Sequence, residues 1–265
     1  MNVYYTTIKG RRESNEDRHN IILNINKLQS DINPINMLGI YDGHGGTFVS
    51  EFLEKNLPKF YCNKSFQLPF SEEYHYELFE FLQKKILENE RGYRCGSTCL
   101  LNLMYKYGDE IHMNIINLGD CRLVIVYSNG EYKQVTTDHK PDDPKEKQRL
   151  ELMGGEIYRD SEGTIRIGDL SLSKAFGDGD NLPYISQKPD VFYKRITSLS
   201  KYVVMGCDGL WDVINNEDLF GILNRFKSKG STNLAKDLAE LALEKGTTDN
   251  VSIIIIELDN TKKNN

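Results

Sequence analysis

Residues 37–46 of this chain read MLGIYDGHGG, an apolar run that stops at Asp42 and continues into a glycine-rich turn. Residues 202–212 repeat the arrangement as YVVMGCDGLWD, in which the carboxylate is Asp208. Such an apolar run predicts a buried strand, and Asp-Gly predicts a tight turn at its end. Each motif alone is typical of an ordinary turn. Two strands that end in a carboxylate can also bring oxygen ligands to one edge of a sheet, where they could bind a divalent cation.

Composition favours one soluble domain. The 265 residues are 39% hydrophobic and 27% charged, which is ordinary for a globular protein. We find no tandem repeat or linker, so we expect a single domain over residues 1–258 and a polar, disordered tail at residues 259–265. A formal net charge of −6 argues against a large nucleic-acid or anionic-membrane surface. Five cysteines without paired CxxC spacing indicate thiols, and therefore the cytoplasm or the nucleus.

Membrane attachment is not expected either. The first residues lack the apolar core of a signal peptide, and residue 2 is Asn instead of the Gly that N-myristoylation requires. The longest aliphatic run, Ile253 to Ile256, is too short to cross a bilayer.

Strands and helices both recur along the chain. Apolar, β-branched runs predict strands at residues 21–25, 37–41, 97–105, 111–117, 122–127, 202–205 and 251–257. Apolar faces at helical spacing predict helices near residues 46–57, 78–87 and 231–245, and Asp143-Pro144 predicts the start of another that stops at Gly154. Residues 62–72 and 158–190 look irregular, and the second segment could form a flap beside a site. The mixture predicts an α+β layered domain.

Acidic residues occupy strand or turn boundaries in five places. They are Glu16-Asp17, Asp42, Asp120, Asp208 and Asp249. Like charges gathered at one sheet edge repel unless cations neutralise them, and an all-oxygen ligand set favours Mg²⁺ or Mn²⁺ over zinc. Arg12 and His44 lie near these acids in the sequence. A cation site with one Arg and one His suits phosphoester hydrolysis, because Arg grips phosphate and His can protonate a leaving oxygen.

Eight short motifs resemble, in order, those of the metal-dependent (type 2C, PPM-type) Ser/Thr protein phosphatases. The motifs are RESNED (12–17), YDGHGG (41–46), GST (96–98), NLGDCR (117–122), TDHKP (137–141), LSKAFGD (172–178), CDGLWD (207–212) and TDNVS (248–252). Each motif alone is weak evidence, but eight in the family's order are very specific.

The resemblance implies a four-layer α-β-β-α sandwich, with two mostly antiparallel sheets flanked by helix pairs and metals at one end. It implies an enzyme that hydrolyses phosphoserine and phosphothreonine in proteins. The nucleophile would be a metal-bridging hydroxide at a site of two Mg²⁺ or Mn²⁺ ions, with no phosphoenzyme intermediate. We expect phosphorylated proteins as substrates and a monomer that binds neither nucleic acid nor membrane.

The same resemblance implies the metal ligands. Asp42 would bridge two cations, and the carbonyl of Gly43 would bind one of them. Asp208 and Asp249 would hold the other cation. Asp120, together with Asp208, would match a weaker third metal site.

The resemblance also implies roles for the residues around the metals. Glu16 and Asp17 would orient metal-bound waters, with Asn250 beside them. Arg12 would bind the substrate phosphate, and His44 would be the general acid.

Alternatives remain open from the sequence. A non-catalytic member of the same fold would be expected to lose metal carboxylates, which are present here, and a small-molecule or nucleic-acid hydrolase could use a similar dimetal site. Arg11 could share or take over the contact of Arg12 with phosphate. Two residues depart from the family pattern: Lys174 replaces the usual Arg and predicts weaker loop anchoring, and Cys121 replaces the usual Ser.

Overall fold

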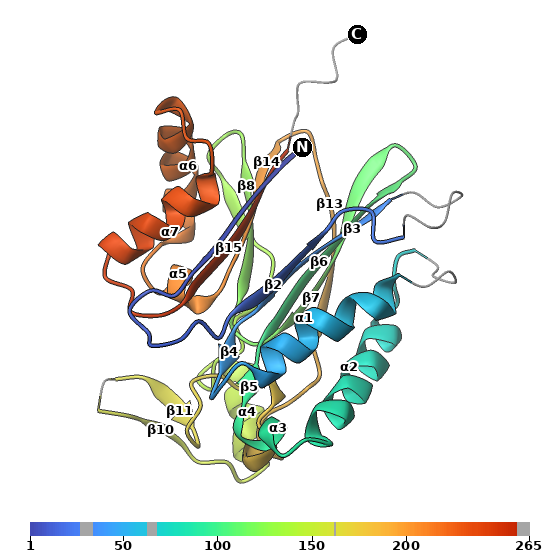
Figure 1. Cartoon of the computed structure of the whole chain (residues 1–265), viewed down its shortest axis with the longest axis vertical. Helices are drawn as coiled ribbons and strands as arrows, with labels where there is room; N and C mark the ends of the chain where they lie inside the picture. The colour runs from blue at the N-terminus through green and yellow to red at the C-terminus, as the bar shows by residue number, and fades with distance from the viewer. Residues whose placement is uncertain (27–33, 63–67, 162, 259–265) are drawn as a thin grey trace.

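The computed structural model describes residues 1–26, 34–62, 68–161 and 163–258. Two five-stranded sheets face each other, and pairs of helices cover their outer faces (Figure 1). This arrangement confirms the predicted four-layer α-β-β-α sandwich. The predicted tail at residues 259–265 lies outside the described residues, and the single-domain boundary stays a prediction.

The first sheet brings the two ends of the described chain together. Its strand order is β1 (Asn2–Ile8), β15 (Val251–Glu257), β14 (Ser200–Gly206), β8 (Arg122–Tyr127) and β9 (Tyr132–Gln134), and every pair is antiparallel. The helices α6 (Leu219–Ser228) and α7 (Leu234–Glu244) pack their leucine and alanine faces against it.

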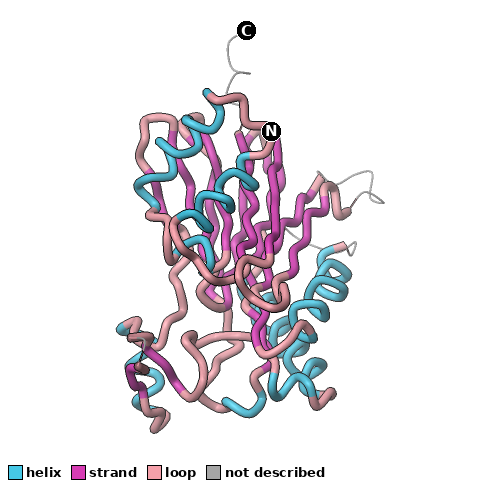
Figure 2. The backbone as a smooth tube through the Cα atoms, turned by 60° about the vertical axis from the view of Figure 1, so that its left-hand side comes forward, coloured by secondary structure: helices cyan, strands magenta, loops and turns pink. Residues whose placement is uncertain are grey.

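The second sheet is also antiparallel. Its order is β13 (Asp190–Arg195), β7 (Glu110–Leu118), β6 (Cys99–Tyr107), β3 (Ile35–Tyr41) and β2 (Arg18–Ile22). The helices α1 (Phe48–Tyr61) and α2 (Glu72–Leu87) cover its outer face. Figure 2 shows the strands of the two sheets running side by side between the helix pairs.

Burial on both faces explains why the central strands are mostly apolar. In β3, Leu38 and Ile40 face the core between the sheets, whereas Met37 and Tyr41 face the helices α1 and α2. Successive side chains of a strand point to opposite faces, so a strand in an inner layer is apolar at most positions on both faces.

Several short elements connect the sheets to the end of the sandwich where the acidic turns lie. They are β4 (Gly43–His44), α3 (Arg91–Arg94), β5 (Gly96–Ser97), α4 (Pro144–Leu152), β10 (Ile157–Arg159), β11 (Ile165–Ile167), β12 (Phe176–Gly177) and α5 (Asp208–Trp211). The prediction that residues 158–190 are irregular is partly wrong, because β10 and β11 form an antiparallel hairpin there. We call residues 158–190 the flap.

Other predicted helices and strands are present, but some of them begin or end at different residues. Asp143 caps α4, since its carboxylate accepts hydrogen bonds from the backbone of Lys145 and Glu146 at 3.0 and 3.3 Å. The helix predicted from residue 231 begins only at Leu234, because the side chain of Asn233 caps it. The strand predicted over residues 97–105 is divided at Thr98 into β5 and β6.

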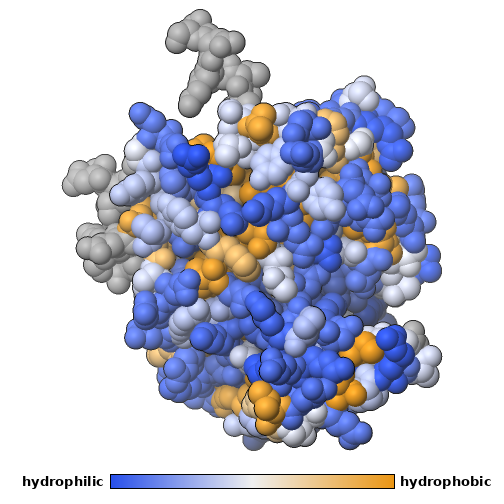
Figure 3. Space-filling model, turned by 180° about the vertical axis from the view of Figure 1, so that it is seen from behind, coloured by the Kyte–Doolittle hydropathy of each residue, from blue (hydrophilic) through white to orange (hydrophobic). Residues whose placement is uncertain are grey.

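The surface is mostly polar in the view from behind, where hydrophobic residues form small separate groups (Figure 3). Among the described residues, no helix combines the length and the apolar character that a membrane span needs.

Candidate active site

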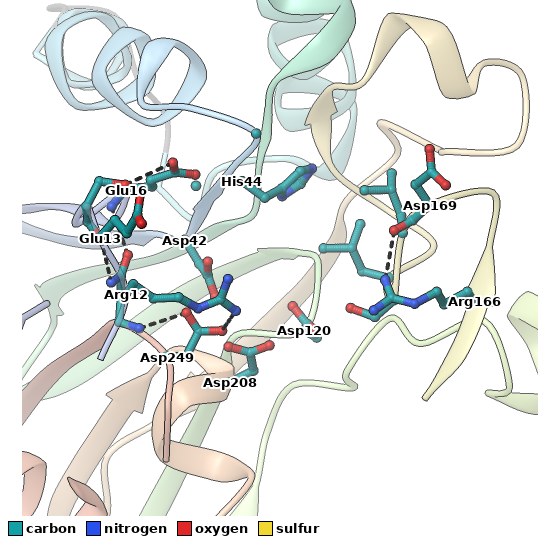
Figure 4. Close-up of a pocket in the computed structure, with 17 residues that line it drawn as sticks. Arg12, Glu13, Glu16, Asp42, His44, Asp120, Arg166, Asp169, Asp208 and Asp249 are labelled. Atoms are coloured by element: carbon teal, nitrogen blue, oxygen red, sulfur yellow. Dashed lines mark hydrogen bonds and ion pairs between the residues drawn. The ribbon is translucent and has the colours of Figure 1, made fainter. Parts of the chain in front are cut away.

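Four carboxylates meet where strands of both sheets end or begin. Asp42 follows β3, Asp120 lies in the turn after β7, Asp208 opens α5 just beyond β14, and Asp249 lies just before β15. They line a cavity of about 460 Å³. Figure 4 shows the four side chains directed toward one another. The strand-end carboxylates of the sequence analysis are therefore brought together in space.

Local hydrogen bonds and a close backbone approach fix the turn that carries Asp42. The amide of Asp42 donates to Thr98 Oγ1 at 3.0 Å, and its carbonyl accepts from the amide of Thr98 at 2.9 Å. Gly45 has a φ of +69°, and a Cβ at this position would collide with the carbonyl oxygen of Arg94. The turn therefore requires glycine after His44.

The turn that carries Asp208 is fixed from behind by Trp211. The indole of Trp211 donates to the carbonyl of Gly206 at 2.8 Å, and the side chain is buried. The backbone amide of Cys207 donates to the carbonyl of Ser252 at 3.2 Å. These contacts confirm the structural interpretation of Trp211 and join the ends of β14 and β15.

The carboxylates repel one another strongly in the absence of a cation. Oxygens of Asp42, Asp120 and Asp208 all lie within 4.8 Å of one another. Burial, followed by the charge of Asp208, raises the pKa of Asp42 well above its usual value. Burial, followed by the charge of Asp120, raises the pKa of Asp208 to about 8. A divalent cation would relieve this repulsion, because it supplies the missing positive charge.

The chemistry of the donors fits a hard cation. Asp17 is buried, its Oδ2 has no hydrogen-bond partner among the described residues, and burial raises its pKa to about 6. Cys207 lies beside Asp17 and Asp42, but burial raises the pKa of its thiol well above the usual value. The thiol instead donates a hydrogen bond from Sγ to the carbonyl of Asn250 at 3.4 Å. Oxygen donors alone suit Mg²⁺ or Mn²⁺.

Two basic side chains already contact the carboxylates. Arg12 Nη2 lies 2.6 Å from Asp249 Oδ2, and the Arg12 side chain is 58% exposed at the mouth of the cavity. Lys140 donates from Nζ to Asp120 Oδ2. Burial by itself lowers the pKa of Lys140, but the charges of Asp120 and Asp208 outweigh it and raise that pKa. Lys140 belongs to the TDHKP motif, and nothing in the sequence indicated its role.

Glu16 and Asn250 tie the N-terminal segment to the site. The amide of Glu16 donates to Asn250 Oδ1 at 2.8 Å, and Glu16 Oε2 accepts from the amide of Gly46 at 3.0 Å. Asn250 Nδ2 donates to the carbonyls of Lys9 and Ser14 at 2.7 and 2.9 Å. Glu16 lies on the cavity wall with Asn250, as a residue that orients water would require.

His44 contacts an acid that the sequence analysis had not assigned a role. His44 Nε2 lies 2.9 and 2.8 Å from the two carboxylate oxygens of Asp178. Burial by itself lowers the pKa of His44, but the hydrogen bond and charge of Asp178, with Asp120 and Glu16, raise it above its usual value. The only sequence signal for Asp178 was its position at the end of the LSKAFGD motif.

The two residues that depart from the family pattern, Lys174 and Cys121, both contact neighbouring polar side chains. Lys174 Nζ lies 2.9 Å from Asp190 Oδ1 and 3.9 Å from Glu146 Oε1, and its side chain is 10% exposed. Cys121 Sγ lies 3.1 Å from Thr98 Oγ1. Lys174 therefore joins the middle of the flap to α4 and to the start of β13 through two carboxylates.

A family comparison agrees with this geometry. The family model "Protein phosphatase 2C" matches residues 1–251. The chain belongs to the protein phosphatase 2C family. Members of this family are serine/threonine protein phosphatases, so the chain is an enzyme of that kind.

Several relatives of this 2C phosphatase cover nearly all of it. "Probable protein phosphatase 2C 7" of Oryza sativa subsp. japonica is 30% identical over 270 residues, which covers 99% of this chain and 67% of the rice protein. "Probable protein phosphatase 2C 59" of Arabidopsis thaliana is 30% identical over 260 residues, covering 95% of this chain and 78% of the plant protein. A solved C. elegans sex determining protein matches with a TM-score of 0.84 at 29% identity, over 96% of this chain and 64% of that chain.

The flap supplies the opposite wall of the phosphatase cavity. Arg166 and Asp169 lie across the cavity from the four carboxylates (Figure 4). Arg166 Nε lies 2.6 Å from Asp160 Oδ2, and its Nη1 donates to the carbonyl of Asp169 at 2.8 Å. No sequence signal had assigned Arg166 to the site.

Proposed function

We propose that this 2C phosphatase hydrolyses phosphoserine and phosphothreonine in proteins at a centre of two Mg²⁺ or Mn²⁺ ions. The ligands would be Asp42, the Gly43 carbonyl, Asp208 and Asp249, with Asp120 and Asp208 forming a weaker third site. The observation that carries the proposal is the convergence of strand-end carboxylates, whose burial and mutual repulsion raise the pKa values of Asp42 and Asp208. A cluster of this kind favours divalent cations.

The bound cations would supply an activated water and neutralise the phosphate oxygens, with in-line attack and no phosphoenzyme. Side chains of the protein would bind the phosphate, protonate the leaving oxygen and orient the water. The guanidinium of Arg12 would bind the phosphate, since it lies exposed at the cavity mouth. His44 would give a proton to the leaving serine or threonine oxygen. Glu16 and Asp17 would orient the metal-bound water, and Asn250 would hold Glu16 in place through its backbone amide.

The substrates would be phosphorylated proteins of the cytoplasm or the nucleus. No disulfide joins the five cysteines, as a reducing compartment would require. The cavity opens at the surface between Arg12 and the flap, where a phosphorylated side chain could enter.

The test is a panel of phosphoserine, phosphothreonine and phosphotyrosine peptides, assayed with millimolar Mg²⁺ or Mn²⁺ and then with a chelator. We expect turnover of the serine and threonine peptides that disappears with the chelator. Asp208→Asn should abolish turnover and lose a metal site by titration calorimetry. Glu217→Gln removes one acidic charge from the exposed segment after α5 and should change neither. Activity that persists without metal would refute the proposal.

The absence of a phosphoenzyme needs its own measurement. A chiral phosphorothioate substrate that carries two oxygen isotopes at phosphorus, hydrolysed in water of the third isotope, should give thiophosphate of inverted configuration, because direct attack by water is a single displacement. Retention of configuration would indicate two displacements and a covalent intermediate. A protein that binds no Mn²⁺ in calorimetry would instead favour the non-catalytic scaffold.

A further inference from the structure

The His44 ring is held by one carboxylate at one of its two nitrogens. Both oxygens of Asp178 lie within 2.9 Å of Nε2. Asp178 is nearly fully buried, with a side-chain exposure of 3%. A buried carboxylate accepts a hydrogen bond and cannot donate one when ionised, so Nε2 must carry the hydrogen. This contact leaves Nδ1 as the nitrogen that can exchange a proton with a substrate.

The backbone around Asp178 holds its carboxylate in place. The amide of Asp178 donates to the carbonyl of Cys95 at 3.0 Å, and its φ of +50° is unusual for a residue other than glycine. The preceding residue, Gly177, is bound on both backbone groups by the buried side chain of Gln83 on α2, each at 2.8 Å. A backbone held in a sparsely populated conformation by such contacts is a common feature of functional sites.

The space between the two side chains admits no other group. Gly96 pairs with His44 across β4 and β5, and a Cβ at Gly96 would overlap both His44 Nε2 and Asp178 Oδ2. The glycine therefore makes room for the hydrogen bond.

We propose that Asp178 is the positioning residue for the general acid His44. It fixes the imidazole with Nε2–H directed at the carboxylate, so that Nδ1–H delivers the proton to the leaving oxygen of the substrate. As the P–O bond breaks, its electron pair stays on that oxygen and takes the Nδ1 proton. The ring is left neutral and still protonated on Nε2. This inference rests on the acid role proposed for His44 above.

The test compares two substrates that differ in their need for a proton. A phosphoserine peptide has an alkoxide leaving group that must be protonated, whereas nitrophenyl phosphate releases a phenolate that barely needs a proton. His44→Ala should slow the peptide by about 100-fold or more and the aryl ester far less. Asp178→Asn keeps the shape of the side chain and should slow the peptide by about 10- to 100-fold, again with little effect on the aryl ester.

A double variant and a spectroscopic measurement separate positioning from a merely structural role. The His44→Ala/Asp178→Asn protein should be no slower on the peptide than His44→Ala, because Asp178 acts only through His44. Nitrogen NMR of the labelled imidazole should show that neutral His44 carries its hydrogen on Nε2 in the native protein. In Asp178→Asn the same measurement should show a mixture of the Nε2–H and Nδ1–H tautomers. The matched control is Asp180→Asn, which removes an exposed carboxylate two residues away and should leave both rates unchanged.

The outcomes separate this inference from the proposed function. Equal slowing of both substrates in His44→Ala overturns the acid role itself. Selective slowing in His44→Ala, combined with equal slowing of both substrates in Asp178→Asn or with additive losses in the double variant, overturns only the role of Asp178.

Discussion

Arg12 and Asp249 form an ion pair in which Arg12 Nη2 lies 2.6 Å from Asp249 Oδ2. The pair joins the residue proposed for the substrate phosphate to a residue proposed for the metal. The charge of Asp249 raises the pKa of Arg12, so the guanidinium stays charged. Because one carboxylate oxygen cannot serve Arg12 and a cation equally well, metal binding should release Arg12 toward the cavity mouth.

This relationship predicts opposite effects of Arg12→Ala on substrate and on metal. We expect kcat/KM for phosphopeptides to fall by about 10- to 100-fold, the worth of a charged hydrogen bond. Mn²⁺ should bind at least as tightly as in the native protein, because a competing cation has been removed. Steady-state kinetics and titration calorimetry measure the two effects.

Arg12→Lys and Arg11→Ala complete the comparison. Lysine keeps the charge but loses the planar fork, so its kcat/KM should be intermediate. Arg11→Ala tests the alternative that the sequence left open. A larger loss in Arg11→Ala than in Arg12→Ala would move the phosphate role to Arg11.

The pKa of Asp208, raised to about 8, predicts that the metal-free protein loses stability as pH rises. The unfolded carboxyl has a pKa of about 3.9. The stabilising contribution of the protonated group is therefore fully present below pH 4 and is lost as pH rises through about 8. Metal-free Asp208→Asn, which resembles the protonated form, should melt at a higher temperature than the metal-free native protein at pH 8.5. The difference should disappear only below about pH 4, where the carboxyl is protonated in both the folded and the unfolded protein.

The affinity for metal should change with pH in the opposite direction to the stability of the metal-free protein, because both depend on the protonation of Asp208. Mn²⁺ must displace the proton of Asp208, so its affinity should rise between pH 6 and 8 and binding should release protons. Calorimetry in two buffers with different ionisation enthalpies counts those protons. An affinity that is unchanged across this pH range would contradict the repulsion inferred among the carboxylates.

The residues alone predicted an α+β layered domain with carboxylates at strand ends, because apolar runs and the turns after them are local features of the sequence. The four-layer sandwich was implied by the resemblance to the family. Strands such as β3 and β14 are buried on both faces and are apolar from Met37 to Tyr41 and from Tyr202 to Gly206, and Asp42 and Asp208 lie just beyond their ends. The helix α6 was missed, since it has no capping side chain at its start and contains Gly221. The edge strand β1 was missed because it is only partly buried and mixes polar with apolar residues.

The sequence could not predict which side chains from distant segments touch. His44 and Asp178 are 134 residues apart, and the small sheet β12-β5-β4 brings them together, because Gly177 and His44 both pair with Gly96. The contact of Lys140 with Asp120 likewise needs the loop after β9 to fold back onto the turn after β7. Spacing along the chain carries no signal for such pairs, so roles based on them came only from the structure.

Lys174 should anchor the middle of the flap. Lys174→Met leaves the carboxylates of Asp190 and Glu146 without this partner, although Glu146 keeps Arg149 at 2.8 Å. We expect the free energy of unfolding to fall by about 2–4 kcal/mol, measured by denaturant titration. Lys174→Arg restores the charge and should recover most of that loss. A native-like Lys174→Met protein would mean that the ion pairs contribute nothing to stability.

Lys140 should weaken the binding of a cation at the third metal site. Its ammonium donates to the buried Asp120 and therefore occupies a carboxylate that a third cation would need. Lys140→Met should destabilise the metal-free protein by about 1–3 kcal/mol, because Asp120 loses its partner. The variant should also bind Mn²⁺ about tenfold more tightly at the weak site, since the competing charge is gone.

Lys145→Met, on the exposed side of α4, is the matched control and should behave as the native protein. Titration calorimetry and melting with and without Mn²⁺ distinguish the possibilities. Weaker Mn²⁺ binding in Lys140→Met would mean that Lys140 holds Asp120 in position for the metal instead of competing with it.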